Sequence, residues 1–362
     1  MVDRPNITLT ERDLELFYVL YKFRALNVPQ IHELFFRENE RRNYVYKRLY
    51  VLKHSGFLED KAIVKEDGRK SSSVYFIKIK ALEALKEYGI IDEYNRNQER
   101  LRLEGRRMAQ VLLVNDILVQ LTPFGYQMKD SRETKATFAL DRNSHINGCL
   151  ITPDGKKTIA IYAIEQYATE KMMNSLITEV KKMLQIDHVL IMLNKPDEQY
   201  EDFERIIRKE MHHFRSNVML LPFQTGMYLL KKLGTERSQE KMFEKIGPVR
   251  FNQKGVFPYT VLHNGEPKYI VEYAMTGTGV LRKLKRYSPA DYRQDGKKVI
   301  VLTWEGMVDA LAQEFEHFEY VEFVGVNFDQ VPDLPLDNTL KGFLKTSLIK
   351  SNLSEEGSKL YI

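Results

Sequence analysis

The chain contains a single cysteine, Cys149, among its 362 residues. One cysteine cannot form an intrachain disulfide or a cysteine-rich zinc site, so both kinds of cross-link are excluded. The first six residues also lack the basic-then-apolar layout of a secretory signal. We therefore expect a reducing, cytoplasmic location.

Long apolar runs are missing as well. The longest run is a handful of residues, whereas a membrane-spanning helix needs about 20, so we expect no membrane partner. Hydrophobic residues nevertheless make up 43% of the chain, and 19 Phe and 20 Tyr supply enough apolar surface to exclude general disorder. Because single cores stop growing near ~250–300 residues, the length predicts several domains.

Two catalytic signatures are absent from the sequence. No Gly-Lys-Ser/Thr phosphate loop is present, which argues against an ATP-driven motor. None of the eight histidines has the His-x-His spacing of a relaxase metal site. The adjacent pair His212 and His213 lies in a predicted helix, where neighbouring side chains diverge by ~100° and cannot chelate one ion together. We expect no cofactor.

Charge is unevenly distributed along the chain. The whole sequence carries 55 Lys and Arg against 50 Asp and Glu, a net charge of +5. Residues 41–80 alone hold eleven basic residues against four acidic ones, a net charge of +7, whereas residues 1–40 stand at −2. A basic segment of this kind is typical of a surface that faces phosphates.

The first eighty residues have the pattern of three helices followed by a hairpin. Thr10 with Asp13 predicts the start of the first helix, and Pro29 lies in the first turn of a second helix over Val28–Phe36. A third helix is predicted from Glu40 to His54, ended by Ser55-Gly56. Strands are predicted over Phe57–Val64 and Ser73–Ile79, with a basic turn at residues 66–70 between them. This order predicts an N-terminal winged helix-turn-helix.

The third predicted helix has two faces. Val45, Leu49 and Leu52 share the buried stripe. The candidate DNA-binding residues come from the rest of this helix and from the wing: Arg41, Arg42, Asn43, Tyr44, Lys47, Arg48, Lys65, Arg69 and Lys70. Two other interpretations stay open, because winged helices also dock proteins and basic helix faces are often merely solvated. Tyr44, Tyr46 and Tyr50 could contact the sugar-phosphate backbone or pack at the helix flank.

A strongly apolar helix is predicted over Leu103–Leu121, with Asn115 and Asp116 inside its apolar run. The simpler interpretation of these two residues is that they hydrogen-bond neighbouring elements in the core. A winged helix followed by such a Val-Asn-Asp-Ile helix resembles the replication-relaxation family of plasmids and mobile elements, over roughly residues 8–230. The resemblance implies a role in plasmid replication and DNA relaxation, and an α/β body like that of restriction endonucleases.

The residues of the predicted α/β body depart from the nuclease pattern. Such nucleases need an aspartate on one strand and Glu-x-Lys on the next, to hold Mg²⁺ and activate water. Glu165 stands in place at the end of the predicted strand Thr158–Glu165, but residue 167 is Tyr and the preceding strand offers Asn147, with Asp154 on the turn. We interpret this unit as a nuclease-like scaffold without catalytic or metal-binding residues.

The same order of elements recurs over residues 250–330: hairpin, helix, strand, helix, strand. Glu272 stands where Glu165 stands in the first unit. The fold class expected is therefore α/β, with an N-terminal winged helix-turn-helix and two degenerate restriction-endonuclease-like units. A glycine-rich turn before a basic helix adds candidate phosphate contacts at Gly277, Gly279, Arg282 and Lys283, and the simpler interpretation is a tight turn.

These observations predict four regions: a winged helix at 1–95, α/β units at 96–235 and 236–330, and a C-terminal arm at 331–362 that docks on the body or on a protein partner. The function expected is sequence-specific binding of double-stranded DNA by a homodimer, in replication control or transcription regulation of a plasmid, phage or integrative element, without catalysis. A metal-dependent nuclease or nickase using Glu165 or Glu272 remains an alternative, as does a partner-docking adaptor.

Overall fold

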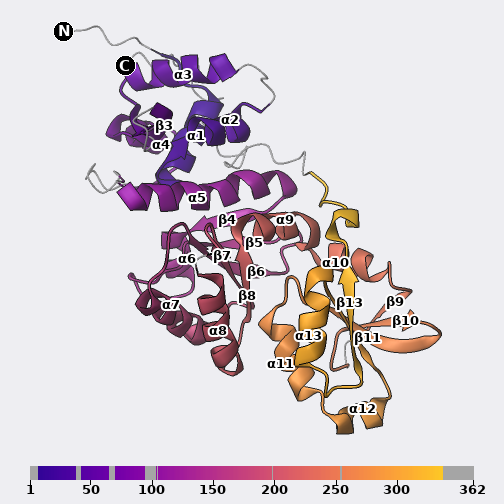
Figure 1. Cartoon of the computed structure of the whole chain (residues 1–362). Coiled ribbons are helices and arrows are strands. Elements are labelled where there is room, and N and C mark those ends of the chain that lie inside the picture. The colour runs from indigo at the N-terminus through magenta and orange to yellow at the C-terminus, as the bar shows by residue number, and fades with distance from the viewer. Residues whose placement is uncertain are drawn as a thin grey trace. The chain divides into compact units, whose positions relative to one another are not determined.

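The computed structural model of the chain describes residues 7–37, 42–64, 70–93, 103, 105–197, 199–252 and 255–336 (Figure 1). The protein is of the mixed α/β type, and its described strands form three sheets. The chain divides into two compact units, one that reaches Pro123 and one over Phe124–Leu336. None of the described helices combines the length and hydropathy needed to cross a membrane.

The first unit surrounds a small antiparallel sheet with helices. The strands lie in the order β1-β3-β2, and β1 joins the sheet through Leu26 opposite Tyr75. The elements of this unit, in chain order, are α1 (Glu11–Phe23), β1 (Leu26–Asn27), α2 (Val28–Phe35), α3 (Arg42–His54), β2 (Leu58–Val64), β3 (Lys70–Ile77), α4 (Ile79–Glu87) and α5 (Gly105–Leu121). Three helices precede the hairpin, as the sequence predicts.

Local side-chain chemistry sets the ends of these helices. Thr10 and Asp13 form a capping box at the start of α1, each side chain accepting from the other residue's backbone N–H. Asn27 and Gln30 do the same for α2. After α3 the chain turns at Gly56, whose φ of 83° suits glycine. The predicted start of the first helix, both ends of the second to within one residue, and the end of the third are therefore confirmed. The predicted start of the third helix, Glu40, lies outside the described residues.

Polar residues of α5 bind the neighbouring elements of the first unit. The Asn115 side chain is buried and donates from Nδ2 to the carbonyls of Phe23 and Ala25. Gln30 of α2 donates to Asp116 Oδ1 at 2.7 Å and to the carbonyl of Leu112 at 2.9 Å. The prediction that Asn115 and Asp116 hydrogen-bond within the core is confirmed, and α5 belongs to the first unit.

The second unit contains two five-stranded sheets of equal strand order and direction. In each sheet three strands form an antiparallel meander and two more are added in parallel. The first sheet has the order β4-β5-β6-β7-β8. Its elements are β4 (Gln127–Asp130), α6 (Ser131–Thr137), β5 (Gly148–Ile151), β6 (Thr158–Ile164), α7 (Glu170–Lys182), β7 (His188–Leu193), α8 (Tyr200–Glu210) and β8 (Asn217–Pro222).

The second sheet has the order β13-β12-β11-β10-β9. Helices α9 (Phe223–Leu233) and α10 (Glu236–Phe243) connect the two sheets. The elements that follow are β9 (Val249–Phe251), β10 (Tyr259–His263), β11 (Glu266–Glu272), α11 (Thr278–Arg286), α12 (Pro289–Asp295), β12 (Val299–Trp304), α13 (Val308–Glu314) and β13 (Val321–Val326). The repeat of hairpin, helix, strand, helix and strand is thus present in the topology.

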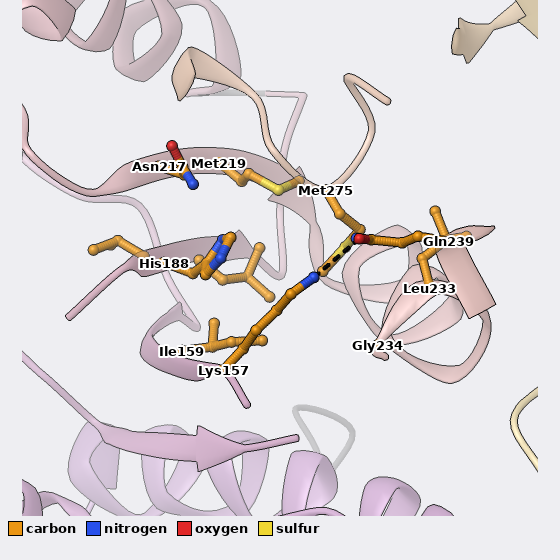
Figure 2. Close-up of a pocket in the computed structure, with 11 residues that line it drawn as sticks. Lys157, Ile159, His188, Asn217, Met219, Leu233, Gly234, Gln239 and Met275 are labelled. Carbon is orange, nitrogen blue, oxygen red and sulfur yellow. Dashed lines mark hydrogen bonds between the residues drawn. The ribbon is translucent and has the colours of Figure 1, made fainter. Parts of the chain in front are cut away.

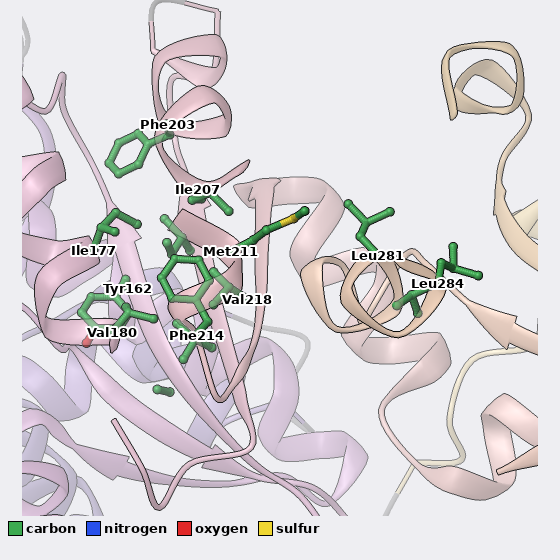
Figure 3. Close-up of a cluster of buried hydrophobic side chains, with 14 of the residues drawn as sticks. Tyr162, Ile177, Val180, Phe203, Ile207, Met211, Phe214, Val218, Leu281 and Leu284 are labelled. Atoms are coloured by element: carbon green, nitrogen blue, oxygen red, sulfur yellow. The ribbon is translucent and has the colours of Figure 1, made fainter. Parts of the chain in front are cut away.

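One hydrophobic core joins both halves of the second unit. Tyr162, Phe203 and Val218 of the first half belong to the same buried cluster as Leu281 and Leu284 of α11 (Figure 3). The predicted division at residues 235/236 separates two halves that share this core. The predicted boundary at residues 95/96 likewise assigns α5 to the α/β body, whereas α5 packs in the first unit.

Candidate nucleic-acid interface

Helix α3 presents one apolar and one polar face. Val45, Leu49 and Leu52 are fully buried, as predicted. The opposite side of the helix carries Asn43, Lys47, Tyr50 and His54, and all four are exposed. Residues at these spacings lie on one side of a helix, so they form a continuous strip about three turns long. We call these four residues the outer face of α3.

Three tyrosines of α3 are unusually exposed for aromatic residues. Tyr44, Tyr46 and Tyr50 are 51%, 52% and 62% exposed. Tyr44 lies at the flank, where its ring meets Phe36 edge-on at 5.8 Å. Tyr50 lies on the outer face, and its ring lies against the His54 ring in a tilted arrangement, with the centroids 3.8 Å apart. Tyr44 therefore contacts another ring at the flank of α3, whereas Tyr50 is presented to solvent on the outer face.

The Arg48 side chain points inward rather than toward solvent. Its Nε donates to Asp13 Oδ1 at 2.9 Å, a second nitrogen donates to Asp13 Oδ2, and the same nitrogen reaches the carbonyl of Thr8 at 3.0 Å. Asp13 is 2% exposed. The hydrogen bond to Asp13 raises the pKa of Arg48 further above its ordinary value. Arg48 thus fixes α3 against the start of α1.

Lys47 is the exposed cation of the outer face, and it has no ion-pair partner within the described residues. Lys53, one and a half turns on, pairs with Asp60 of β2 at 2.5 Å. Arg41, Lys65 and Arg69 lie outside the described residues. For Arg42 and Lys70 the structure describes only the backbone, in α3 and β3. Most of the predicted C-terminal arm, residues 337–362, also lies outside the described residues.

The predicted phosphate contacts belong to a tightly packed helix start. Gly277 has a φ of 40°, and a Cβ there would lie 2.6 Å from the carbonyl oxygen of Val218. Thr278 Oγ1 accepts from the backbone N–H of Val218 at 2.9 Å. The glycine turn at Gly277 and Gly279 therefore brings α11 against β8. Arg282 donates to the carbonyl of Ser216 at 3.0 Å, and Lys283 is exposed.

The nuclease-like positions of the first sheet have structural roles. Asn147 Oδ1 accepts from the backbone N–H of Ala163 at 2.7 Å, which extends the pairing of β5 with β6. Asp154 accepts from Thr152 Oγ1 at 2.6 Å and from the backbone N–H of Glu236 at 3.2 Å. Glu165 follows β6 and is partly exposed, and Tyr167 is 55% exposed. No group of three or more His, Cys, Asp or Glu side chains converges within the described part of the chain.

A small pocket lies inside the second unit, beside the amino ends of β6, β7 and β8 (Figure 2). Lys157 Nζ donates to Gln239 Oε1 at 3.0 Å, and Gln239 Nε2 approaches Glu272 Oε1 at 3.4 Å. Complete burial raises the pKa of Glu272 to about 7. Burial, together with the nearby Lys157, lowers the pKa of His188 to about 4. The hydrogen-bonded side chains of Lys157, Gln239 and Glu272 thus connect the two halves beside the pocket.

Several of these contacts have no signal in the sequence. Asp13 and Arg48 are 35 positions apart, and nothing in the spacing marks them as a pair. Gln239 lies in α10, a helix that is not among the elements predicted from the sequence. The capping box of α10, where Thr235 and Ser238 exchange hydrogen bonds, is the local signal that could have revealed this helix.

Comparison with known protein families finds a match: the sequence model of the replication-relaxation family matches residues 17–167. This stretch runs from α1 through β6, so it includes α3, α5 and the first hairpin of the α/β body. The predicted resemblance is confirmed over this range, which is narrower than residues 8–230. Neither the curated proteins nor the solved structures contain a match to the chain.

Proposed function

From the match of residues 17–167 to the sequence model of the replication-relaxation family, we propose that the protein binds double-stranded DNA of a plasmid, phage or integrative element. The proposed role is control of replication or transcription at a specific site, without catalysis. The observation that carries the proposal is the outer face of α3, which exposes Asn43, Lys47, Tyr50 and His54 inside the segment of net charge +7.

The arrangement of the first unit supports a winged helix-turn-helix. Helices α1, α2 and α3 precede a β2–β3 hairpin, and β1 completes the sheet beside β3. In such proteins the third helix enters the major groove, whose width of about 12 Å matches the diameter of a helix. Here α3 is the proposed recognition helix and the hairpin, with Lys65, Arg69 and Lys70, is the proposed wing.

Arg48 has a different role in this proposal from the one the sequence suggests. Because its guanidinium binds the buried Asp13, it positions α3 instead of contacting phosphate. Lys47, Tyr44 and Asn43 remain as proposed DNA contacts with described side chains. A homodimer would place two copies of α3 in successive major grooves, about 34–36 Å apart, and would require a target with two-fold symmetry.

The α/β body acts as a scaffold in this proposal. The repeated sheets with Glu165 and Glu272 are proposed to derive from two restriction-endonuclease-like units. Asn147 and Tyr167 replace residues of the nuclease pattern, and Glu272 is buried and accepts from the backbone N–H of Met275 at 2.6 Å. Incubating supercoiled DNA with the intact protein and Mg²⁺ or Mn²⁺ tests this part: nicking that disappears in Glu165→Gln would establish the nuclease alternative.

The DNA-binding proposal is tested with the intact chain. Genome-wide capture of DNA fragments by the protein should recover a recurring sequence, and a gel-shift assay on that sequence then compares variants. We expect Lys47→Ala to weaken binding about 5–10-fold, because it removes one phosphate contact. Lys86→Ala, which removes an exposed charge from α4, is the matched control and should bind as the parent does. Equal affinity for all three proteins would contradict the proposal, and affinity for a partner protein instead would favour the docking alternative.

A further inference from the structure

The outer face of α3 has a distinctive chemical composition. It offers one amide, one ammonium group, one phenol and one imidazole, from Asn43, Lys47, Tyr50 and His54. The arginine of α3 whose side chain is described, Arg48, is bound to Asp13. Arginine and lysine read guanine, whereas Asn reads adenine and apolar or aromatic groups contact the thymine methyl. With Lys47 taken as a phosphate contact, Asn43 and Tyr50 are the base-reading groups of the described outer face, and both suit A·T pairs.

Tyr50 is held in place although it is exposed. The residue is 62% exposed, yet its ring lies against the His54 ring, with the centroids 3.8 Å and the planes 31° apart. His54 is fixed in turn, because its Nδ1 lies 2.9 Å from the carbonyl oxygen of Tyr50. A ring supported on one side keeps its other side and its edge available for a ligand. Such pre-organisation reduces the entropy lost when the ring contacts a base.

We propose that Tyr50 determines specificity for A·T pairs, its ring packing against the methyl group of a thymine in the major groove. This inference rests on the proposed DNA-binding function. Asn43 lies seven residues earlier on the same face, about 10.5 Å along the helix axis, and reads adenine with its amide. Lys47, between them, contacts phosphate.

Replacement of thymine by deoxyuridine tests the contact, because it removes the methyl group and leaves base pairing intact. The probe is a duplex selected by the intact protein from a random library, resynthesised with deoxyuridine at one thymine position at a time. We expect one or more positions at which the parent protein loses about fourfold in affinity, the value for one buried methyl-sized group. Tyr50→Ala should bind the thymine and deoxyuridine duplexes equally.

Two further variants distinguish the contribution of the Tyr50 ring from that of its hydroxyl and from the general effect of removing an exposed tyrosine. Tyr50→Phe keeps the ring and should remain sensitive to deoxyuridine. Tyr167→Ala removes a similarly exposed tyrosine from the second unit and should behave as the parent does. Thermal melting of each variant checks that its fold is retained.

Three results would overturn the inference. The parent could be insensitive to deoxyuridine at every position, Tyr50→Ala could remain as sensitive as the parent, or Tyr50→Phe could lose the sensitivity, which would assign the contact to the hydroxyl. In each case DNA binding itself would stand. Failure of the parent to select any duplex would overturn the DNA-binding proposal and this inference together.

Discussion

The basic side chains of the two compact units make two kinds of contact. In the first unit Lys47 projects from the outer face of α3, whereas Arg48 turns inward to a buried aspartate. In the second unit Lys268 binds Glu322 at 2.9 Å and Lys232 binds the carbonyl of Val331 at 2.6 Å, while Arg205 and Arg237 are exposed. Each unit thus uses some basic residues in its packing and exposes others. The net charge of a sequence segment therefore describes a surface only after the residues held in internal contacts are set aside.

The largest expected effect comes from the inward-facing cation of the first unit. Arg48→Ala leaves the buried Asp13 carboxylate without its counter-charge, so we expect the free energy of unfolding of this unit to fall by roughly 2–4 kcal/mol. Hydrogen exchange at the α1 and α3 amides under mild denaturant measures the change. Arg37→Ala breaks the exposed pair with Glu33 and should cost less than about 0.5 kcal/mol. Equal losses of stability in the two variants would show that the Arg48–Asp13 pair contributes no more than an exposed ion pair.

The next effect concerns the turn before α11 in the second unit. Gly277→Ala places a Cβ against the Val218 carbonyl and a side chain at positive φ, so we expect a loss of about 2–4 kcal/mol. Gly296→Ala, at a φ of 69° with open space around it, should cost only about 1 kcal/mol. Denaturant unfolding of both variants makes the comparison. If the costs were equal, close packing would not explain the glycine at residue 277.

The buried carboxyl of the second unit gives a pH dependence. The pKa of Glu272 is raised in the folded state, so the folded protein binds more protons than the unfolded chain between about pH 4.5 and 7, and stability falls as pH rises through this range. The lowered pKa of His188 has the opposite sign between about pH 4 and 6.5, because there the unfolded chain binds more protons. The two slopes oppose each other where they overlap.

Glu272→Gln separates these two contributions. We expect this substitution to raise the free energy of unfolding above pH 7 by roughly 1–3 kcal/mol, because it removes a buried charge. The increase in stability with rising pH that His188 causes should remain. Thermal melting between pH 4 and 8 measures both. A variant whose melting temperature follows that of the parent at every pH would show that Glu272 titrates as an ordinary carboxyl.

The smallest effect distinguishes two lysines of α3. Lys47 has no ion-pair partner within the described residues, whereas Lys53 pairs with Asp60. Lys47→Ala should reduce the salt dependence of DNA binding by about one unit of slope, and Lys53→Ala should reduce it less. Titrations at several salt concentrations measure both slopes. Equal slopes would mean that Asp60 releases Lys53 when DNA binds.

Local signals explain why most elements were predictable. The Thr10 and Asp13 box, Pro29 after Asn27, and Gly56 after His54 each act within a few residues of a helix end, and each prediction is confirmed. Short elements are not predicted from the sequence, because the interactions that stabilise them come from residues distant along the chain. Strand β1 has only two residues, Leu26 and Asn27, and exists because β3 pairs with it.

The candidate site was predictable in part. The buried stripe of α3 follows from helical periodicity, so the outer face follows as well. The direction of Arg48 does not, because it depends on Asp13, which belongs to another helix. Gly277 and Gly279 resemble a phosphate-binding turn in sequence, yet their neighbours come from β8, on the other half of the unit. Residue type and spacing cannot distinguish a glycine that approaches a ligand from one that approaches another strand.

The continuous core of the second unit limits how its two halves can change. Met211 and Val218 of one half pack in the same buried cluster as Leu281 of the other (Figure 3). A substitution in one half changes the space that side chains of the other half fill in this shared core. Tolerated replacements should therefore come in matched pairs, one residue from each half. The two halves repeat one topology, and because they share one core we expect them to unfold as a single cooperative body.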